Sequence, residues 1–242
     1  MAEQPLLSVD GLRAGYGGKP VLQGIDLAVR PDEIVAVIGR NGVGKSTLIR
    51  TLIGLLPLDA GSIRYRGAEI GRLPAHGRAR LGIGYVPQGR DVFPRMTVED
   101  NLRVGEMLGG KMLGGRADAA AYERVYENFP ILKERRRQIA GTLSGGQQQQ
   151  LAIGRVLIGK PALILLDEPS EGIQPSIVQD IARICVGLNR HAGLAIVLVE
   201  QNIDMIRAMA QRCYVMDKGR LIAELTADML DDRETVRRYL SV

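Results

Sequence analysis

A glycine-rich loop between an apolar segment and an amphipathic segment limits the fold of this chain more than any other feature. Residues 39–46, GRNGVGKS, show a glycine, four further residues, then Gly-Lys-Ser. The preceding segment, IVAVIG at 34–39, is typical of a buried strand, and the following segment, STLIRTLIGLL at 46–56, is typical of an amphipathic helix. Strand, loop and helix in this order are the context that a phosphate-binding loop requires. The sequence therefore predicts an α/β fold with an anion site at the end of one strand.

The residue types in the loop explain how it would bind phosphate. Gly39, Gly42 and Gly44 would let backbone N–H groups turn toward phosphate oxygens without Cβ clashes. The N-terminus of the following helix adds the positive end of its dipole. Lys45 would reach the β- and γ-phosphates of a nucleotide, and Ser46 would offer its hydroxyl to Mg²⁺. The alternative is a glycine-rich turn with an incidental lysine, but the flanking strand and helix favour a phosphate-binding loop.

Two adjacent acidic residues form a second candidate site. Asp167 and Glu168 directly follow the apolar run ALILL at 162–166. Ligands of open α/β sheets bind at the carboxyl ends of the strands, where these two side chains would lie. Asp167 is predicted to hold Mg²⁺ directly or through water, and Glu168 to polarise an attacking water. Two adjacent acids can also mark no more than a solvated strand end, but the phosphate loop favours the functional interpretation.

Further apolar runs predict a parallel sheet around the loop. Residues 82–86 and 194–199 are typical of buried strands rich in Ile, Val and Leu. Between the runs that end at Asp167 and begin at 194, residues 176–189 carry Ile and Leu at helical spacing, and Gly193 is the predicted stop of that helix. Strand, helix and strand in this order imply a right-handed crossover and a mostly parallel sheet.

The two ends of the chain predict antiparallel strands instead. Residues 6–16 and 21–30 have the alternation of a β-meander. Residues 213–225 predict a hairpin that turns at 217–219.

The middle of the chain predicts a helical insertion. Residues 95–158 contain no convincing strand, but they include amphipathic segments and a glycine-rich loop at 109–115. We therefore expect a single domain spanning residues 1–242. Its α/β core with an antiparallel β flank would occupy about 1–94 and 159–242, and its helical lobe 95–158.

Composition excludes several classes of protein. With 45% hydrophobic and 24% charged residues, the chain of 242 residues is not expected to be largely disordered. A net charge of +5 is too small to indicate nucleic acid as a partner. No window approaches 18 consecutive apolar residues, and the N-terminus lacks a basic segment followed by an apolar one, so neither a membrane span nor a secretory signal is expected. Cys185 and Cys213 lie among aliphatic residues, which favours buried thiols in a reducing compartment.

The motif LSGGQ at 143–147 adds a resemblance to a known family. It opens the helix-forming segment 147–158 and lies between the phosphate loop and Asp167. With the three motifs in this order, the chain resembles the ATP-binding subunit of ABC transporters from about residue 6 to 240. The resemblance implies that ATP and Mg²⁺ are bound, and that two copies form a head-to-tail dimer in which the signature of one copy closes over the ATP held by the other. The signature residues that would contact the nucleotide are Ser144, Gly145, Gly146 and Gln147.

The resemblance also implies roles for residues outside the three motifs. Tyr16 falls where the family stacks an aromatic ring on adenine. Gln88 falls where a glutamine joins the site of Mg²⁺ and attacking water to the helical lobe, and residues 89–102 would meet the membrane partner. The expected catalytic residues are Glu168, Lys45, Gln88 and Gln201. The expected Mg²⁺ ligands are Ser46, Gln88 and Asp167. The loop residues expected to bind the nucleotide are Gly39, Asn41, Gly42, Gly44, Lys45, Ser46 and Thr47.

Three positions depart from the family pattern. Gln174 stands where an aspartate is common, Gln150 where an arginine is usual, and Gln201 where a histidine is common. Neither His76 nor His191 lies where it could replace that histidine. A glutamine amide can donate a hydrogen bond to a γ-phosphate, but it cannot carry a proton at physiological pH.

Local sequences favour one branch of the family. Residues 85–102, 170–181 and the segment EQN at 200–202 resemble the ATPases of importers for branched-chain amino acids and for urea or short amides, and residues 171–181 favour the urea branch. The resemblance implies a second ATPase subunit, identical or related, integral membrane permeases, and indirectly a solute-binding protein. It implies no nucleic acid partner, and it implies a peripheral position on the cytoplasmic face of the inner or plasma membrane.

Two other functions are compatible with parts of the sequence. A non-transport ABC ATPase that acts on nucleic acid or ribosomes would usually carry two cassettes or a long coiled-coil insertion, and neither pattern is seen. A regulatory module that binds ATP without turnover does not need the pair Asp167 and Glu168 together with LSGGQ. The sequence therefore favours an importer ATPase.

Overall fold

The computed structural model describes residues 4–108 and 118–232 of the chain. The strands in these ranges are β1 (Leu7–Tyr16), β2 (Lys19–Val29), β3 (Ile34–Ile38), β4 (Ala60–Tyr65), β5 (Ala68–Glu69), β6 (Ile83–Val86), β7 (Leu163–Asp167), β8 (Ala195–Val199), β9 (Arg212–Asp217) and β10 (Arg220–Thr226). The helices are α1 (Lys45–Ile53), α2 (Ala75–Arg80), α3 (Val98–Leu108), α4 (Ala119–Asn128), α5 (Pro130–Glu134), α6 (Gly145–Ile158), α7 (Pro175–Ala192), α8 (Ile203–Met209) and α9 (Ala227–Asp231).

The central six-stranded sheet is mostly parallel, as the apolar runs predict. Its strand order is β10-β9-β3-β8-β7-β6, and every pair from β9 to β6 is parallel. Alternate residues of β3 contribute to two cores on opposite faces. Ile34, Ala36 and Ile38 belong to one core, and Val35 and Val37 to the other. Because both faces are covered, these strands read as continuous apolar runs in the sequence.

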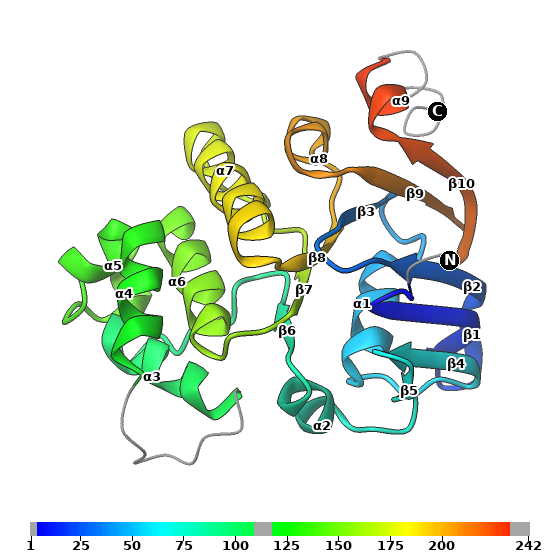
Figure 1. The fold of residues 1–242 in the computed structure, drawn as a ribbon, viewed down its shortest axis with the longest axis horizontal. Helices are drawn as coiled ribbons and strands as arrows, with labels where there is room; N and C mark the ends of the chain where they lie inside the picture. The colour runs from blue at the N-terminus through cyan, green and yellow to red at the C-terminus, as the bar shows by residue number, and fades with distance from the viewer. Residues whose placement is uncertain (1–3, 109–117, 233–242) are drawn as a thin grey trace.

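A second, antiparallel sheet lies at one end of the molecule (Figure 1). Its order is β2-β1-β4-β5, and the β1–β2 pair is the one that the N-terminal alternation predicts. The strands β4 and β5 are not evident from the sequence, since β5 has two residues and three of the six residues of β4 are exposed. The C-terminal hairpin is also present, but β9 runs parallel beside β3, so this hairpin extends the central sheet and does not join the antiparallel sheet.

The helices α3 to α6 gather at the other end of the molecule (Figure 1). They lie within the segment predicted to be helical, and its described residues form no strand, although Thr97 and Ile139 make one isolated β-bridge. Leu102, Val125 and Leu132 pack together with α6 in the core on this side of the central sheet. The predicted glycine-rich loop at 109–115 lies outside the described residues. Within the ranges that the structure describes, no helix is both long enough and apolar enough to cross a bilayer.

A buried arginine terminates α1, the helix that follows the phosphate loop. Arg78 on α2 is 1% exposed. Its guanidinium donates to the carbonyls of Thr51 and Leu52 at the end of α1, at 2.7 and 2.8 Å, and to those of Gly71 and Leu73 at 2.8 and 3.0 Å. The last carbonyls of a helix have no partner within it and carry the negative end of its dipole, so a cation there stabilises the helix.

Candidate functional site

The predicted phosphate loop connects β3 to α1, as the sequence indicates. Gly44 is the N-cap of α1 at φ 113°, a left-handed conformation that favours glycine, and it offers the helix no side-chain cap. The first backbone N–H groups of α1 are therefore not capped by the residue before it. A side chain at Gly39 would place its Cβ 2.3 Å from the carbonyl oxygen of Met216. Gly39 is thus also required by the close approach of the β9–β10 hairpin, which the sequence alone does not reveal.

The Lys45 ammonium lies inside this loop. The residue is 4% exposed. Its Nζ donates to the carbonyl oxygens of Gly39 and Arg40 at 2.9 and 3.0 Å, and it lies 3.5 Å from Glu168 Oε1. The loop thus holds a buried ammonium at the N-terminus of α1, an arrangement that suits an anion.

Asp167 and Ser46 face each other beside the loop. Asp167 ends β7, and its Oδ1 accepts a hydrogen bond from Ser46 Oγ at 3.1 Å. Burial raises the pKa of Asp167 to about 6, although the Ser46 hydrogen bond and the charges of Arg50 and Lys45 act in the opposite direction. A carboxylate and a hydroxyl supply the oxygen ligands that Mg²⁺ prefers.

The Ser46 hydroxyl and the Asp167 carboxylate fit a Mg²⁺ site with few protein ligands. Among the described residues, no group of three or more His, Cys, Asp or Glu side chains could hold a metal ion. Mg²⁺ is commonly bound by one or two protein oxygens together with substrate phosphates and water. Ser46 and Asp167 fit that arrangement, and Gln88 lines the same cavity as Asp167.

Glu168 is the point where the predicted catalytic residues meet. Lys45 Nζ lies 3.5 Å from its Oε1, Gln201 Nε2 donates to Oε1 at 2.9 Å, and Gln88 Nε2 donates to Oε2 at 3.4 Å. Glu168 itself adopts φ 47°, which costs a non-glycine residue about 1–2 kcal/mol. Its backbone N–H donates to Val199 O at 2.8 Å and helps to hold this conformation. Three residues far apart in the sequence therefore converge on the Glu168 carboxylate.

Two further acids beside this carboxylate were not predicted. The shorter hydrogen bond of Gln88 Nε2 goes to Glu171 Oε2, at 3.0 Å. Glu200 is 2% exposed, and its carboxylate accepts the backbone N–H groups of Ser170, Gln201 and Asn202 at 2.6–2.9 Å. Glu200 thus fixes the backbone after β7 and after β8. Their adjacency to Asp167–Glu168 and to Gln201 was the available signal, but acidic residues at strand ends are too common to single them out.

Tyr16 lies at the edge of a cavity of about 450 Å³ that also includes Asp167 and Gln88. Tyr16 is 45% exposed, so one face of its ring is accessible. A hydrogen bond with Tyr16 raises the pKa of Arg50, and burial raises the pKa of Tyr85, which lines the same cavity, to about 12. Arg50 was not predicted, although it follows Ser46 by one helical turn and so shares its side of α1.

The signature residues lie on a different element from the phosphate loop. Ser144 is the N-cap of α6 and forms a capping box with Gln147: Ser144 Oγ accepts from Gln147 N at 3.4 Å, and Gln147 Oε1 accepts from Ser144 N at 3.0 Å. A Cβ at Gly145 would lie 3.1 Å from the Arg90 guanidinium, and one at Gly146 would lie 2.6 Å from Ile177. Figure 1 places α1 and α6 on either side of β7. Within one chain, the signature is thus positioned by the helical region and by α7.

The remaining predicted positions are placed as follows. Gln201 Nε2 also donates to Asn41 Oδ1, at 2.6 Å, so that Asn41 belongs to the cluster around Glu168. Thr47 is buried in the first turn of α1. Gln174 is the N-cap of α7 but makes no side-chain capping bond, and Gln150 lies within α6.

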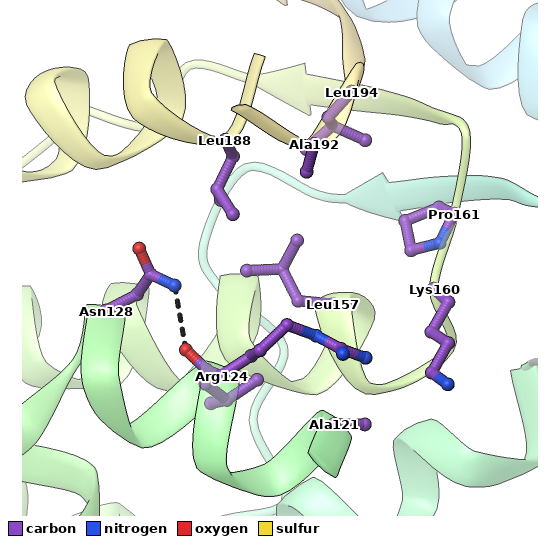
Figure 2. Close-up of a pocket in the computed structure, with 10 residues that line it drawn as sticks. Ala121, Arg124, Asn128, Leu157, Lys160, Pro161, Leu188, Ala192 and Leu194 are labelled. Atoms are coloured by element: carbon purple, nitrogen blue, oxygen red, sulfur yellow. Dashed lines mark hydrogen bonds between the residues drawn. The ribbon is translucent and has the colours of Figure 1, made fainter. Parts of the chain in front are cut away.

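A second cavity, of about 330 Å³, is lined mainly by residues of α4, α6 and α7 (Figure 2). Leu157 at the end of α6 and Leu188 on α7 project toward each other across it, and Asn128 donates to the Arg124 carbonyl at its rim at 2.7 Å. None of the predicted site residues lines this cavity. The cluster around Glu168 is therefore the candidate site.

Comparisons with known proteins identify the family of the chain. A family model described as "ABC transporter" matches residues 22–171. The chain is 44% identical over 232 residues to the high-affinity branched-chain amino acid transport ATP-binding protein BraG of Pseudomonas aeruginosa, covering 96% of this chain and 97% of BraG. It is 37% identical over 235 residues to the lipopolysaccharide export system ATP-binding protein LptB of Escherichia coli strain K12, covering 97% and 96%.

A solved structure confirms the fold class. The chain resembles a nucleotide-free ATP-binding cassette from an ABC transporter with a TM-score of 0.85 and 26% identity, covering 99% of this chain and all of that one. The match spans the central sheet, the antiparallel sheet and the helical region. The chain therefore belongs to the ABC transporter family, as one of its ATP-binding and ATP-hydrolysing subunits.

Proposed function

We propose that the chain is the ATPase subunit of an importer, and that it powers the uptake of a small polar solute through membrane permease partners. The observation that carries the enzymatic part is the convergence of Lys45, Gln88 and Gln201 on the Glu168 carboxylate beside the phosphate loop. The transport part is supported by the similarity to BraG over 96% of the chain.

The phosphate loop would bind the triphosphate of ATP. The Lys45 ammonium, now bonded to two loop carbonyls, would also donate to the β- and γ-phosphates, while the backbone N–H groups of Gly39, Asn41, Gly42, Gly44, Lys45, Ser46 and Thr47 would surround them. Ser46, Asp167 and Gln88 would hold Mg²⁺, which supplies a positive charge to the phosphate oxygens. Tyr16, with its accessible ring, would stack on adenine.

Glu168 would act as the general base. A carboxylate at this position can accept the proton of a water that attacks the γ-phosphate, and Lys45 would stabilise the charge that develops on the phosphate oxygens. Gln201 would approach the γ-phosphate with its amide from the side of Asn41. Most of the rate enhancement would come from positioning and electrostatics, because phosphoryl transfer requires little covalent chemistry from the protein.

A second ATPase subunit, identical or related, would complete the site. The capping box bonds the N–H groups of Ser144 and Gln147 and leaves those of Gly145 and Gly146 at the start of α6, where an anion could accept them. Ser144, Gly145, Gly146 and Gln147 of one subunit would close over the ATP bound by the other. Because the γ-phosphate favours the closed pair, hydrolysis would release it.

Residues 89–102 would contact the permease at the membrane. Phe93 in this segment is 43% exposed, and its ring stacks on the Arg155 guanidinium, 5.2 Å away. Gln88 directly precedes the segment and Arg90 lies within it, and their side chains contact Glu168 and Glu171. Closure at the ATP site would therefore move the segment. The subunit would therefore lie on the cytoplasmic face of the membrane as a peripheral protein, with a solute-binding protein as an indirect partner and with no nucleic acid.

The solute is proposed from similarity. The similarity to BraG supports branched-chain amino acids as the solute. The resemblance of residues 171–181 to the ATPases of urea or short-amide importers stays a prediction that the relatives do not confirm. The similarity to LptB, at 37% over 97% of the chain, makes lipopolysaccharide export a second candidate.

Isolation of the chain with its membrane subunits tests the proposal. We expect integral membrane proteins to co-purify with it, and vesicles reconstituted from the complex to take up labelled leucine or urea when ATP is present on the side of this subunit. ATP-driven extraction of lipopolysaccharide without uptake of either solute would favour the export alternative. Isolation with RNA, DNA or ribosomes, and without membrane proteins, would contradict transport.

A further inference from the structure

The position of Gln201 raises the question of what an amide does between two acceptors. Its Nε2 donates to Asn41 Oδ1 at 2.6 Å and to Glu168 Oε1 at 2.9 Å. An ionised carboxylate only accepts hydrogen bonds, and so does an amide oxygen. A group between them must therefore donate twice. The –NH₂ of glutamine does this from one nitrogen atom, without a charge.

We propose that Asn41 is a positioning residue, which holds the Gln201 amide with its nitrogen toward Glu168 and thereby orients the carboxylate that activates water. This proposal rests on the role proposed for Glu168. It goes beyond that role because it makes Asn41 and Gln201 a pair that acts through Glu168.

The backbone on both sides of the pair is fixed independently of the nucleotide. The buried Glu200 carboxylate accepts the N–H groups of Gln201 and Asn202, which sets the start of the Gln201 side chain. Asn41 lies in the loop whose neighbouring carbonyls, at Gly39 and Arg40, bond to Lys45. The hydrogen bond between Asn41 and Gln201 therefore joins two rigid segments 160 residues apart in the sequence.

The alternatives for position 201 explain why an amide suits it. A neutral imidazole has one N–H and could donate to Asn41 or to Glu168, but not to both, and an imidazolium would add a charge next to Lys45. An amide keeps both bonds at every physiological pH. Without Asn41, the Gln201 amide could turn its oxygen toward Glu168, where two acceptors would repel each other.

The second carboxylate oxygen of Glu168, Oε2, accepts a longer hydrogen bond. Gln88 Nε2 is 3.4 Å from Glu168 Oε2 but 3.0 Å from Glu171 Oε2, so its shorter bond goes elsewhere. Of the two amides that donate to the Glu168 carboxylate, Gln201 therefore makes the shorter hydrogen bond. If the Gln201 amide loses its orientation, the rate of the hydrolysis step should fall.

A double-mutant cycle on the full chain tests the pair. The measured quantities are the single-turnover rate of phosphate release with Mg²⁺ and ATP, and the dissociation constant of ATP. We expect Asn41→Ala to slow phosphate release about tenfold and to change the ATP dissociation constant by less than about threefold, because one hydrogen-bond partner of a positioned amide is lost. In the Gln201→Ala background, the same Asn41→Ala change should slow release by less than about twofold, since the amide that Asn41 orients is gone.

Two further variants sharpen the result. Gln201→Glu has the same shape but puts an oxygen where Nε2 donates, so it should be slower than Gln201→Ala. Asn128→Ala is the matched control: it removes a half-buried asparagine amide that donates within α4, to Arg124 O, and it should leave both quantities unchanged. A structural role for Asn41 would lower the melting temperature without separating the rate from the affinity.

Additivity would overturn the proposal. If Asn41→Ala costs the same factor with and without Gln201, or if it weakens ATP binding and leaves the single-turnover rate unchanged, Asn41 acts on the nucleotide and not through Gln201. Glu168→Gln separates this failure from failure of the proposed function. An inactive Glu168→Gln variant with an additive cycle overturns the pair alone, whereas a fully active Glu168→Gln variant overturns the role of Glu168 and the pair with it.

Discussion

Replacing Asp167 with asparagine should stabilise the folded protein at neutral pH, although Asp167 is a predicted Mg²⁺ ligand. Burial raises the pKa of this carboxyl from 3.8 to about 6. A raised pKa means that the folded state binds the proton more tightly than the unfolded state, so the stability that this proton contributes is complete below pH 3.8 and is lost as the pH rises through about 6. The asparagine amide carries no charge, and its oxygen can still accept the hydrogen bond from Ser46.

The magnitude follows from the difference between the two pKa values. Well above pH 6, ionised Asp167 costs the folded state roughly 3 kcal/mol, and at pH 5 it costs roughly half as much. The variant should be more stable than the parent by about these amounts. Urea unfolding followed by circular dichroism at pH 5.0 and 7.5, with EDTA and without nucleotide, measures both differences.

The pH dependence is what tests the reasoning. A gain that roughly doubles from pH 5.0 to pH 7.5 agrees with a buried carboxylate. A gain that is equal at the two pH values would show that the substitution acts through packing, and a loss of stability at pH 7.5 would show that the charges of Lys45 and Arg50 outweigh burial.

Three other substitutions test the phosphate loop, the signature and the C-terminal end of α1. Lys45→Ala should weaken ATP binding about a hundredfold in a nucleotide titration, because it removes a charge-assisted bond at the centre of the loop; binding at parental affinity would place the phosphates elsewhere. Ser144→Ala should cost about 1 kcal/mol in urea unfolding, because it removes the cap of α6, and it should slow phosphate release; unchanged release would remove Ser144 from the site. Arg78→Leu should cost about 3 kcal/mol, because four carbonyls lose their buried donor. Arg80→Leu, an exposed change on the same helix, is its control and should cost little.

The parts of the fold that local sequence determines could be predicted. The runs at β3, β6, β7 and β8 have both faces covered and are therefore almost continuously apolar. The stop of α7 at Gly193 follows from its left-handed conformation, at φ 65°. By contrast, β4 pairs with β1 and β5 pairs with β4, and short strands of this kind carry little pattern of their own.

The same distinction between local and distant sequence applies to the residues of the candidate site. Lys45, Ser46, Asp167 and Glu168 were predicted, because a phosphate loop and a strand end specify them within a few adjacent residues. Glu200 and Arg78 act through backbone groups that are distant in the sequence, so no local pattern marks them. The bond from Gln201 to Asn41 spans 160 positions, and only the fold shows why a glutamine suits the place of a histidine.

Single-turnover phosphate release by Glu168→Gln tests the central claim most directly. The substitution keeps the size of the side chain and removes the carboxylate on which Lys45, Gln88 and Gln201 converge. The variant should bind ATP within about threefold of the parent affinity and release phosphate at least a hundredfold more slowly, as expected when a general base is lost. Phosphate release near the parent rate would show that Glu168 is not the base and that this cluster is not the hydrolytic site.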